Sequence, residues 1–65
     1  MSESDTFEMA CEFLRESDAA VLILDHASGE ELWIPLSQIN EMHRNPDHTG
    51  TIVMTRWIAR KKGLC

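Results

Sequence analysis

Short apolar segments, each closed by turn-forming residues, follow one another along this chain. In residues 7–14 every second residue is Phe, Met or Cys, and Glu8 and Glu12 stand between them, which is the two-residue period of a half-buried strand. The same segment also fits a helical stripe, and Asp5 with Glu8 has the spacing of a capping box. Because the alternation is unbroken and the downstream sequence is typical of strands, we expect a strand here.

The next segments predict a hairpin. Residues 19–24, AAVLIL, are aliphatic and partly β-branched, as in a central strand. Residues 25–29, DHASG, have the length of a hairpin turn, with Gly29 near the end, where a left-handed residue is usually needed. Residues 31–34, ELWI, return antiparallel as far as Pro35, which lacks an amide donor and therefore weakens or ends the pairing.

A loop and one more strand are expected to follow. Ser37 is positioned to cap a single helical turn. Residues 40–50 predict an exposed loop, because they contain an Asn-Pro-Asp triplet suited to a β-turn with proline at its second position. Residues 51–54, TIVM, predict the last strand.

The chain closes with helix start and stop signals. Thr55 stands where an N-cap would begin a helix over residues 56–62, and basic residues in its last turn complement the helix dipole. Gly63 occupies the left-handed position after the helix, and Leu64 can pack back on it as in a Schellman motif. The whole pattern predicts a mainly β fold: a small antiparallel, SH3-like or partly open barrel of about four strands with a short C-terminal helix.

Length and cysteine content restrict the class of protein. The chain has 65 residues, so we expect one domain over residues 7–65 after a disordered N-terminus over residues 1–6. Cys11 and Cys65 are expected to be free thiols, because no hydrophobic signal segment directs the chain to an oxidising compartment. No apolar stretch approaches the ~20 residues that cross a bilayer. We therefore expect a cytoplasmic protein without a membrane partner.

Charge is distributed unevenly along the chain. Through Leu32 there are nine acidic residues against Arg15 alone, a charge of −8, whereas the remainder has five basic and two acidic residues, a charge of +3. Ordinary solvated surfaces carry such charges. The same distribution also predicts an acidic surface that repels nucleic acid and attracts a basic partner.

No catalytic or metal-binding pattern accompanies these elements. His43 and His48 are five residues apart in a proline-containing loop, no Cys-x-x-Cys pair exists, and a structural zinc site needs four convergent ligands. We also expect a fold this small to lack a cleft of the ~300 Å³ or more that ligand pockets usually need. The sequence therefore predicts a protein that is not an enzyme and uses no cofactor.

Two tryptophans are candidate binding residues. Strand alternation places Trp33 on the face opposite Ile34, where only a thin layer can cover it. Trp57 stands beside Arg56 and Arg60 on the expected helix, so the indole could stack on a base while the cations contact phosphates. Basic residues at a helix end are also routine for dipole reasons, and the acidic half of the chain opposes nucleic-acid binding.

Three segments carry a resemblance to a known group of proteins. AAVLIL, SGEELWIPLSQI and GTIVMTRWIARKKGL together resemble short, uncharacterised proteins of bacteriophages and related mobile elements, over residues 7–64. Leu36 departs from the basic residue that this pattern has after Trp-Ile-Pro. The resemblance implies a phage origin, a small SH3-like or partly open barrel, and a protein that inhibits host defence or transcription by binding a host protein.

Three hypotheses follow. The first is a non-enzymatic inhibitor of a host protein in the bacterial cytoplasm, such as a CRISPR effector or a polymerase, bound through an acidic surface that contains Glu8, Glu12 and Glu16. The second is a single-stranded nucleic-acid-binding module that uses Trp33, Trp57 and the basic helix. The third is a structural homodimer that covers an exposed strand edge.

Overall fold

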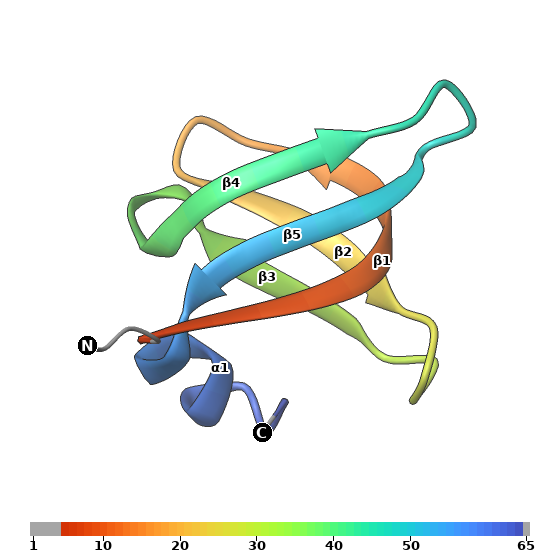
Figure 1. Ribbon diagram of the computed structural model, residues 1–65. Helices are drawn as coiled ribbons and strands as arrows, with labels where there is room; N and C mark the ends of the chain where they lie inside the picture. The colour runs from red at the N-terminus through yellow and green to blue at the C-terminus, as the bar shows by residue number, and fades with distance from the viewer. Residues whose placement is uncertain (1–4, 65) are drawn as a thin grey trace.

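The computed structural model describes residues 5–64, which form five antiparallel strands, one 3₁₀ turn and one α-helix (Figure 1). The elements are β1 (Thr6–Glu16), β2 (Ala20–Asp25), β3 (Glu31–Pro35), η1 (Leu36–Gln38), β4 (Ile39–Arg44), β5 (Thr49–Thr55) and α1 (Arg56–Lys61). The strands form one sheet in the order β3-β2-β1-β5-β4. The prediction of a mainly β fold with a short C-terminal helix is confirmed, with five strands in place of about four.

The sheet bends so that its two halves face each other. In Figure 1, β4 and β5 lie in front of β2 and β3, and β1 passes from one half to the other. Residues 6–12 of β1 pair with β5, and residues 11–16 pair with β2. The register with β2 shifts between Phe13 and Arg15, so Leu14 is the extra residue of a β-bulge, which bends the strand.

The core lies between the two halves of the sheet. Its buried side chains come from four strands and from α1: Cys11, Phe13, Val21, Ile23, Ile34, Ile52, Met54, Ile58 and Ala59. Ile58 and Ala59 are the contribution of the helix, which closes one end of the bent sheet. No polar or charged residue is buried within residues 5–64.

The ambiguous first segment is a strand, as expected. Phe7, Met9, Cys11 and Phe13 turn inward and Glu8 is exposed, which is the alternation that the sequence predicted. β1 begins one residue earlier than expected, at Thr6, and the carbonyl oxygen of Asp5 accepts a 2.8 Å hydrogen bond from the amide of Arg56. Residues 1–4 of the expected disordered segment, and Cys65, lie outside the described residues.

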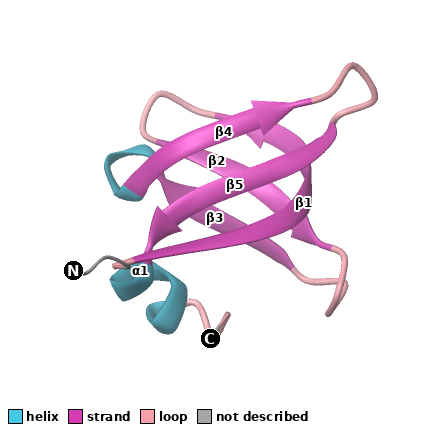
Figure 2. Ribbon diagram, in the orientation of Figure 1, coloured by secondary structure: helices cyan, strands magenta, loops and turns pink. Residues whose placement is uncertain are grey.

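The β2–β3 hairpin agrees with the prediction from sequence. The carboxylate of Asp25 accepts hydrogen bonds from the amide of Ala27 at 3.0 Å and from the hydroxyl of Ser28 at 3.0 Å, which fixes the turn shown as a loop in Figure 2. Gly29 has a φ of 77°, the left-handed conformation expected there. β3 ends at Pro35, also as expected.

Two predictions for the following segment were wrong. The single helical turn is η1, whose N-cap is Pro35 and has no side-chain cap hydrogen bond, so Ser37 is not the cap. The expected loop over residues 40–50 contains β4. A register shift between Ile39 and Glu41 interrupts the alternation of this edge strand, so only Ile39 and Met42 pack on the core and its other residues are polar.

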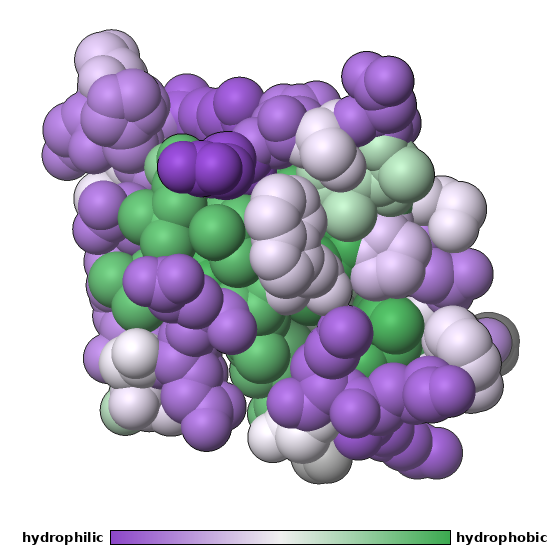
Figure 3. Space-filling view, turned by 180° about the vertical axis from the view of Figure 1, so that it is seen from behind, coloured by the Kyte–Doolittle hydropathy of each residue, from purple (hydrophilic) through white to green (hydrophobic). Residues whose placement is uncertain are grey.

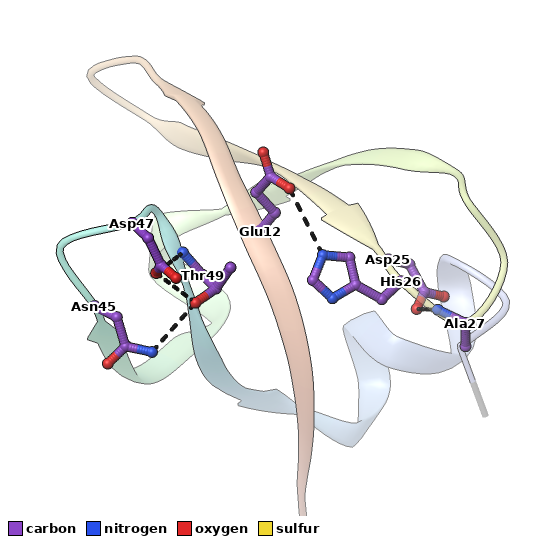
Figure 4. A network of polar contacts seen from close by, with 7 residues as sticks. All are labelled: Glu12, Asp25, His26, Ala27, Asn45, Asp47 and Thr49. Atoms are coloured by element: carbon purple, nitrogen blue, oxygen red, sulfur yellow. Dashed lines mark hydrogen bonds and ion pairs between the residues drawn. The ribbon is translucent and has the colours of Figure 1, made fainter.

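The β4–β5 turn forms at the predicted Asn-Pro-Asp triplet. The amide of His48 donates to the carbonyl oxygen of Asn45 at 3.1 Å, and the carboxylate of Asp47 accepts from the amide of Thr49 at 3.2 Å and from its hydroxyl at 2.6 Å. The two bonds between Thr49 and Asp47, drawn in Figure 4, lower the pKa of Asp47. His48 takes the left-handed conformation, with a φ of 72°.

The signals for α1 are confirmed. The hydroxyl of Thr55 accepts from the amide of Ile58 at 3.3 Å, as an N-cap does. At the other end the amide of Leu64 donates to the carbonyl of Ala59 at 2.8 Å and that of Gly63 to Arg60 at 3.1 Å, the pair of bonds of a Schellman motif. Gly63 has a φ of 75°.

At Gly50 there is no room for a side chain between β4, β5 and the core. A Cβ at this position would overlap the carbonyl oxygen of His43 and would lie 2.9 Å from its carbonyl carbon and 3.1 Å from Cε2 of Phe13. Because the opposing atoms of His43 are backbone, the strands themselves would have to separate to admit a side chain.

We therefore predict that Gly50→Ala lowers the free energy of unfolding by about 2–3 kcal/mol, since overpacking at a backbone contact cannot be relieved by a rotamer change. Thr51→Ala, the next residue on the opposite face of β5, is the control and should lower it by less than about 1 kcal/mol. Urea denaturation measures both values. Equal losses would contradict the assigned contact.

Candidate binding surfaces

The bulge in β1 separates the three glutamates of the predicted acidic surface. Glu8 and Glu12 precede the bulge and lie on the outer face of the sheet, opposite Val53 and Leu24. Glu16 follows the bulge and pairs with Val21, a core residue, so it lies on the other face at the end of the strand. Glu8 and Glu12 therefore share the outer face of β1, and Glu16 does not.

Glu16 instead forms an ion pair at the end of the core. Its Oε1 lies 2.5 Å from a guanidinium nitrogen of Arg44. The central carbon of the same guanidinium group lies 4.9 Å from the ring centroid of Phe13. Both side chains of the ion pair are more than 40% exposed, so the pair contributes little to stability. The sequence had not singled out Arg44.

Two rows of paired residues extend the outer face around Glu8 and Glu12. In the first row Glu8, Val53 and Glu41 are opposite one another across β1, β5 and β4. In the second row, across β1, β2 and β3, Leu24 stands between Glu12 and Glu31. Because the sheet bends, Glu41 and Glu31 lie on its two halves, and Glu8 and Glu12 lie on β1 between them. We call these four carboxylates on the outer side of the bent sheet the acidic outer face: Glu8, Glu12, Glu31 and Glu41. Sequence reasoning missed Glu31 and Glu41 because only the strand register brings them onto this face.

Two histidines contact carboxylates of the acidic outer face. His26 Nε2 lies 3.7 Å from Oε1 of Glu12 (Figure 4), and His43 Nε2 lies 3.1 Å from Oε1 of Glu41. All four side chains are substantially exposed, so the contacts are weak. The three histidines are dispersed: within residues 5–64 no group of three or more His, Cys, Asp or Glu side chains is arranged to hold a metal ion.

Apart from Glu31, the outer face of the β2–β3 hairpin is apolar. Trp33 is directly opposite Leu22 and is 43% exposed, on the face opposite buried Ile34 as the alternation predicted. Figure 3 shows this side of the molecule, where hydrophobic surface runs between hydrophilic margins. The continuous apolar run AAVLIL thus supplies core residues on one face and half-buried aliphatic residues, Leu22 and Leu24, on the other.

The helix borders an open groove of about 640 Å³. It is lined by Asp5, Thr55, Arg56, Trp57, Arg60 and Lys61. The expectation that the fold lacks a depression above ~300 Å³ was therefore wrong. The groove unites the predicted residues Arg56, Trp57 and Arg60, whereas Trp33 is not among its lining residues.

Contacts at this groove hold several of its side chains. Trp57 is 59% exposed, and Nζ of Lys61 lies 5.0 Å from its ring centroid, a cation–π contact. The guanidinium of Arg56 donates to the carbonyl oxygen of Thr6 at 3.4 Å. Asp5 places a carboxylate among the cations, which reduces the positive potential available to a phosphate.

Cys11 is a core residue with an inert thiol. It is completely buried, and burial together with the nearby charge of Asp25 raises the pKa of the thiol to about 11. At neutral pH the thiolate, which is the reactive form, is therefore scarce as well as inaccessible. The chemistry of Cys11 is that of a small apolar side chain.

We predict that Cys11 resists alkylation by iodoacetamide at pH 8 in the native protein and reacts readily in denaturant, because both burial and the raised pKa suppress the thiolate. A Cys65→Ser background leaves Cys11 as the single thiol. Mass spectrometry follows the modification with time. Rapid labelling without denaturant would show that the strand opens readily and would contradict the described burial.

Comparisons with known proteins found no match to this chain. Neither the family models, nor the curated proteins, nor the solved structures contain a match to the chain. In residues 5–64 no helix has the length and apolar character needed to span a membrane. The function is therefore argued from the surfaces described above.

Proposed function

We propose that this chain is a non-enzymatic protein-binding module that presents its acidic outer face to a basic surface of another protein. The observation that carries the proposal is the register of the sheet, which aligns Glu8 with Glu41 and Glu12 with Glu31 on the outside of the fold. The cations Arg56, Arg60 and Lys61 gather at the helix instead. Separated charge of this kind supports attraction to a basic partner in a defined orientation.

The resemblance to phage proteins suggests which partner this is. We infer a host protein whose basic surface faces nucleic acid, such as a CRISPR effector or a polymerase, in the bacterial cytoplasm. The carboxylates would occupy positions that phosphates otherwise take, so the module would act as an inhibitor. The bent five-stranded sheet also supports an SH3-like, partly open barrel as the finer description of the fold.

We predict that Glu8→Lys combined with Glu12→Lys lowers partner capture from host lysate by at least about tenfold, because two carboxylates on one face become cations. Asp18→Lys combined with Glu30→Lys is the matched control: it changes the net charge equally at two exposed residues outside the acidic outer face. Quantitative mass spectrometry of the captured protein compares them. An equal loss in both variants would show that net charge alone, and no particular face, governs binding.

The groove beside α1 favours a second candidate function, binding of single-stranded nucleic acid. An exposed indole next to Arg56, Arg60 and Lys61 is the combination that stacks bases and contacts phosphates. Two observations weigh against it. Asp5 lines the same groove, and Trp33 lies elsewhere, so the groove offers one stacking platform among several cations.

Tryptophan fluorescence separates the two functions. Trp33→Phe leaves Trp57 as the single indole, so any quenching by an added oligothymidylate reports on the groove. If the chain binds protein and not nucleic acid, we expect the oligonucleotide to cause no salt-sensitive quenching. Quenching at low salt that is lost at about 0.5 M salt would instead support nucleic-acid binding, since phosphate contacts release counterions.

A further inference from the structure

The first half of β1 has a strand on one side only. Residues 6–12 pair with β5, but pairing with β2 begins at Cys11, so no strand within residues 5–64 lies along residues 6–10 on the other side. In Figure 4 the ribbon of β1 continues from Glu12 towards its N-terminal end, with no strand between it and the turn that carries Asp25, His26 and Ala27. We call this side of residues 6–10 the free edge of β1 because no strand pairs with it; at its first residue the carbonyl oxygen of Thr6 accepts from the guanidinium of Arg56.

Two hydrogen bonds show which backbone groups face the free edge. The carbonyl of Asp5 accepts from Arg56 at 2.8 Å, and the amide of Phe13 donates to His48 at 2.7 Å, so these odd-numbered residues direct their backbone groups towards the β5 side. Because neighbouring residues of an antiparallel strand alternate in direction, the even-numbered residues face the other way. Glu8 is the middle residue of the free edge. Its backbone amide and carbonyl point away from β5, towards the side where no strand pairs.

The two faces of the free edge differ in chemistry. On the inner face Phe7 and Met9 line a mainly apolar hollow of about 340 Å³, whose other lining residues are Ala10, Asp25, His26, Ala27 and Leu64. On the outer face stands the exposed carboxylate of Glu8, with Glu12 four residues further along β1. A strand laid against this edge would therefore place alternate side chains in an apolar hollow and beside carboxylates.

Charge distinguishes the possible occupants. Two copies of β1 paired antiparallel about Glu8 would bring like carboxylates opposite each other, which destabilises a cross-strand pair. The same charge protects the edge against chance pairing with itself. A partner strand with Lys or Arg on its outer face gains the opposite interaction.

We propose that the free edge of β1 is a strand-addition site for an extended peptide segment in which basic residues alternate with apolar ones. The proposal rests on the protein-binding function and specifies how the basic partner is held: by main-chain hydrogen bonds to Glu8, apolar side chains against Phe7 and Met9, and cations beside Glu8 and Glu12.

The direct test uses the peptide acetyl-TKVKLKVT-amide as the probe and isothermal calorimetry as the measurement. Two backbone-methylated versions carry N-methyl groups on alternate residues, one on the odd and one on the even positions. Strand addition requires that one version loses binding by at least about tenfold and the other retains it, because only every second amide faces β1. Equal binding of both versions, or absence of binding by the unmodified peptide, would overturn the proposal. So would equal binding of a peptide with Glu in place of Lys.

Two protein variants locate the site. Glu8→Gln removes the charge and keeps the amide, so we expect about three- to tenfold weaker peptide binding. Glu8→Pro removes the amide as well and should abolish binding, while the β5 ladder persists because this amide faces away from it. Thermal unfolding checks that both variants fold. Should Glu8→Pro unfold, the methylated peptides still decide the question with the unaltered protein.

Other outcomes assign the edge differently. Concentration-dependent dimerisation in sedimentation, lost in Glu8→Pro, would assign the free edge to a second copy of the chain and overturn the proposal. If the peptides fail while the Glu8→Lys, Glu12→Lys pair still abolishes capture of the partner, the acidic face binds without strand addition. In that case the proposed function stands and this inference fails.

Discussion

The double pairing of β1 is the constraint on which the rest of the structure depends. One strand must pair with β5 and with β2 while the two halves of the sheet face each other across a core of small volume. The bulge at Leu14 provides the bend and exposes 37% of this leucine, while Phe13 beside it remains in the core. At the same level Gly50 lets β4 and β5 approach closely. Closure of the fold therefore depends on one β-bulge and on one position without a side chain.

Much of the fold could be predicted from the sequence because local chemistry determines it. The β2–β3 turn depends on Asp25 and Gly29, and the helix on Thr55 and Gly63, all within a few residues of the bonds that they make. β4 could not be predicted. Its bulge breaks the alternation, and as an edge strand it carries polar residues that, read without the sheet, are typical of a loop.

The two candidate surfaces also differ in how much of each could be predicted from the sequence. Arg56, Trp57 and Arg60 were identified together because one short helix carries them, and the groove does unite them. The acidic outer face depends on which residues pair across strands, and the bulge moves Glu16 off it by a shift of one residue. The sequence predicted one surface for Glu8, Glu12 and Glu16 from their spacing along β1, whereas the folded sheet places Glu16 on the other face.

The free edge is a consequence of the bend. A strand that curves away from β2 in order to pair with β5 leaves half of one side unpaired, so the geometry that encloses the core also creates an edge. An exposed strand edge next to apolar Phe7 and Met9 is prone to pair with other chains and aggregate unless it carries charge. Glu8 supplies that charge at the middle residue. Its negative sign discourages self-pairing and favours a basic strand, so protection of the fold and selection of a partner follow from the same carboxylate.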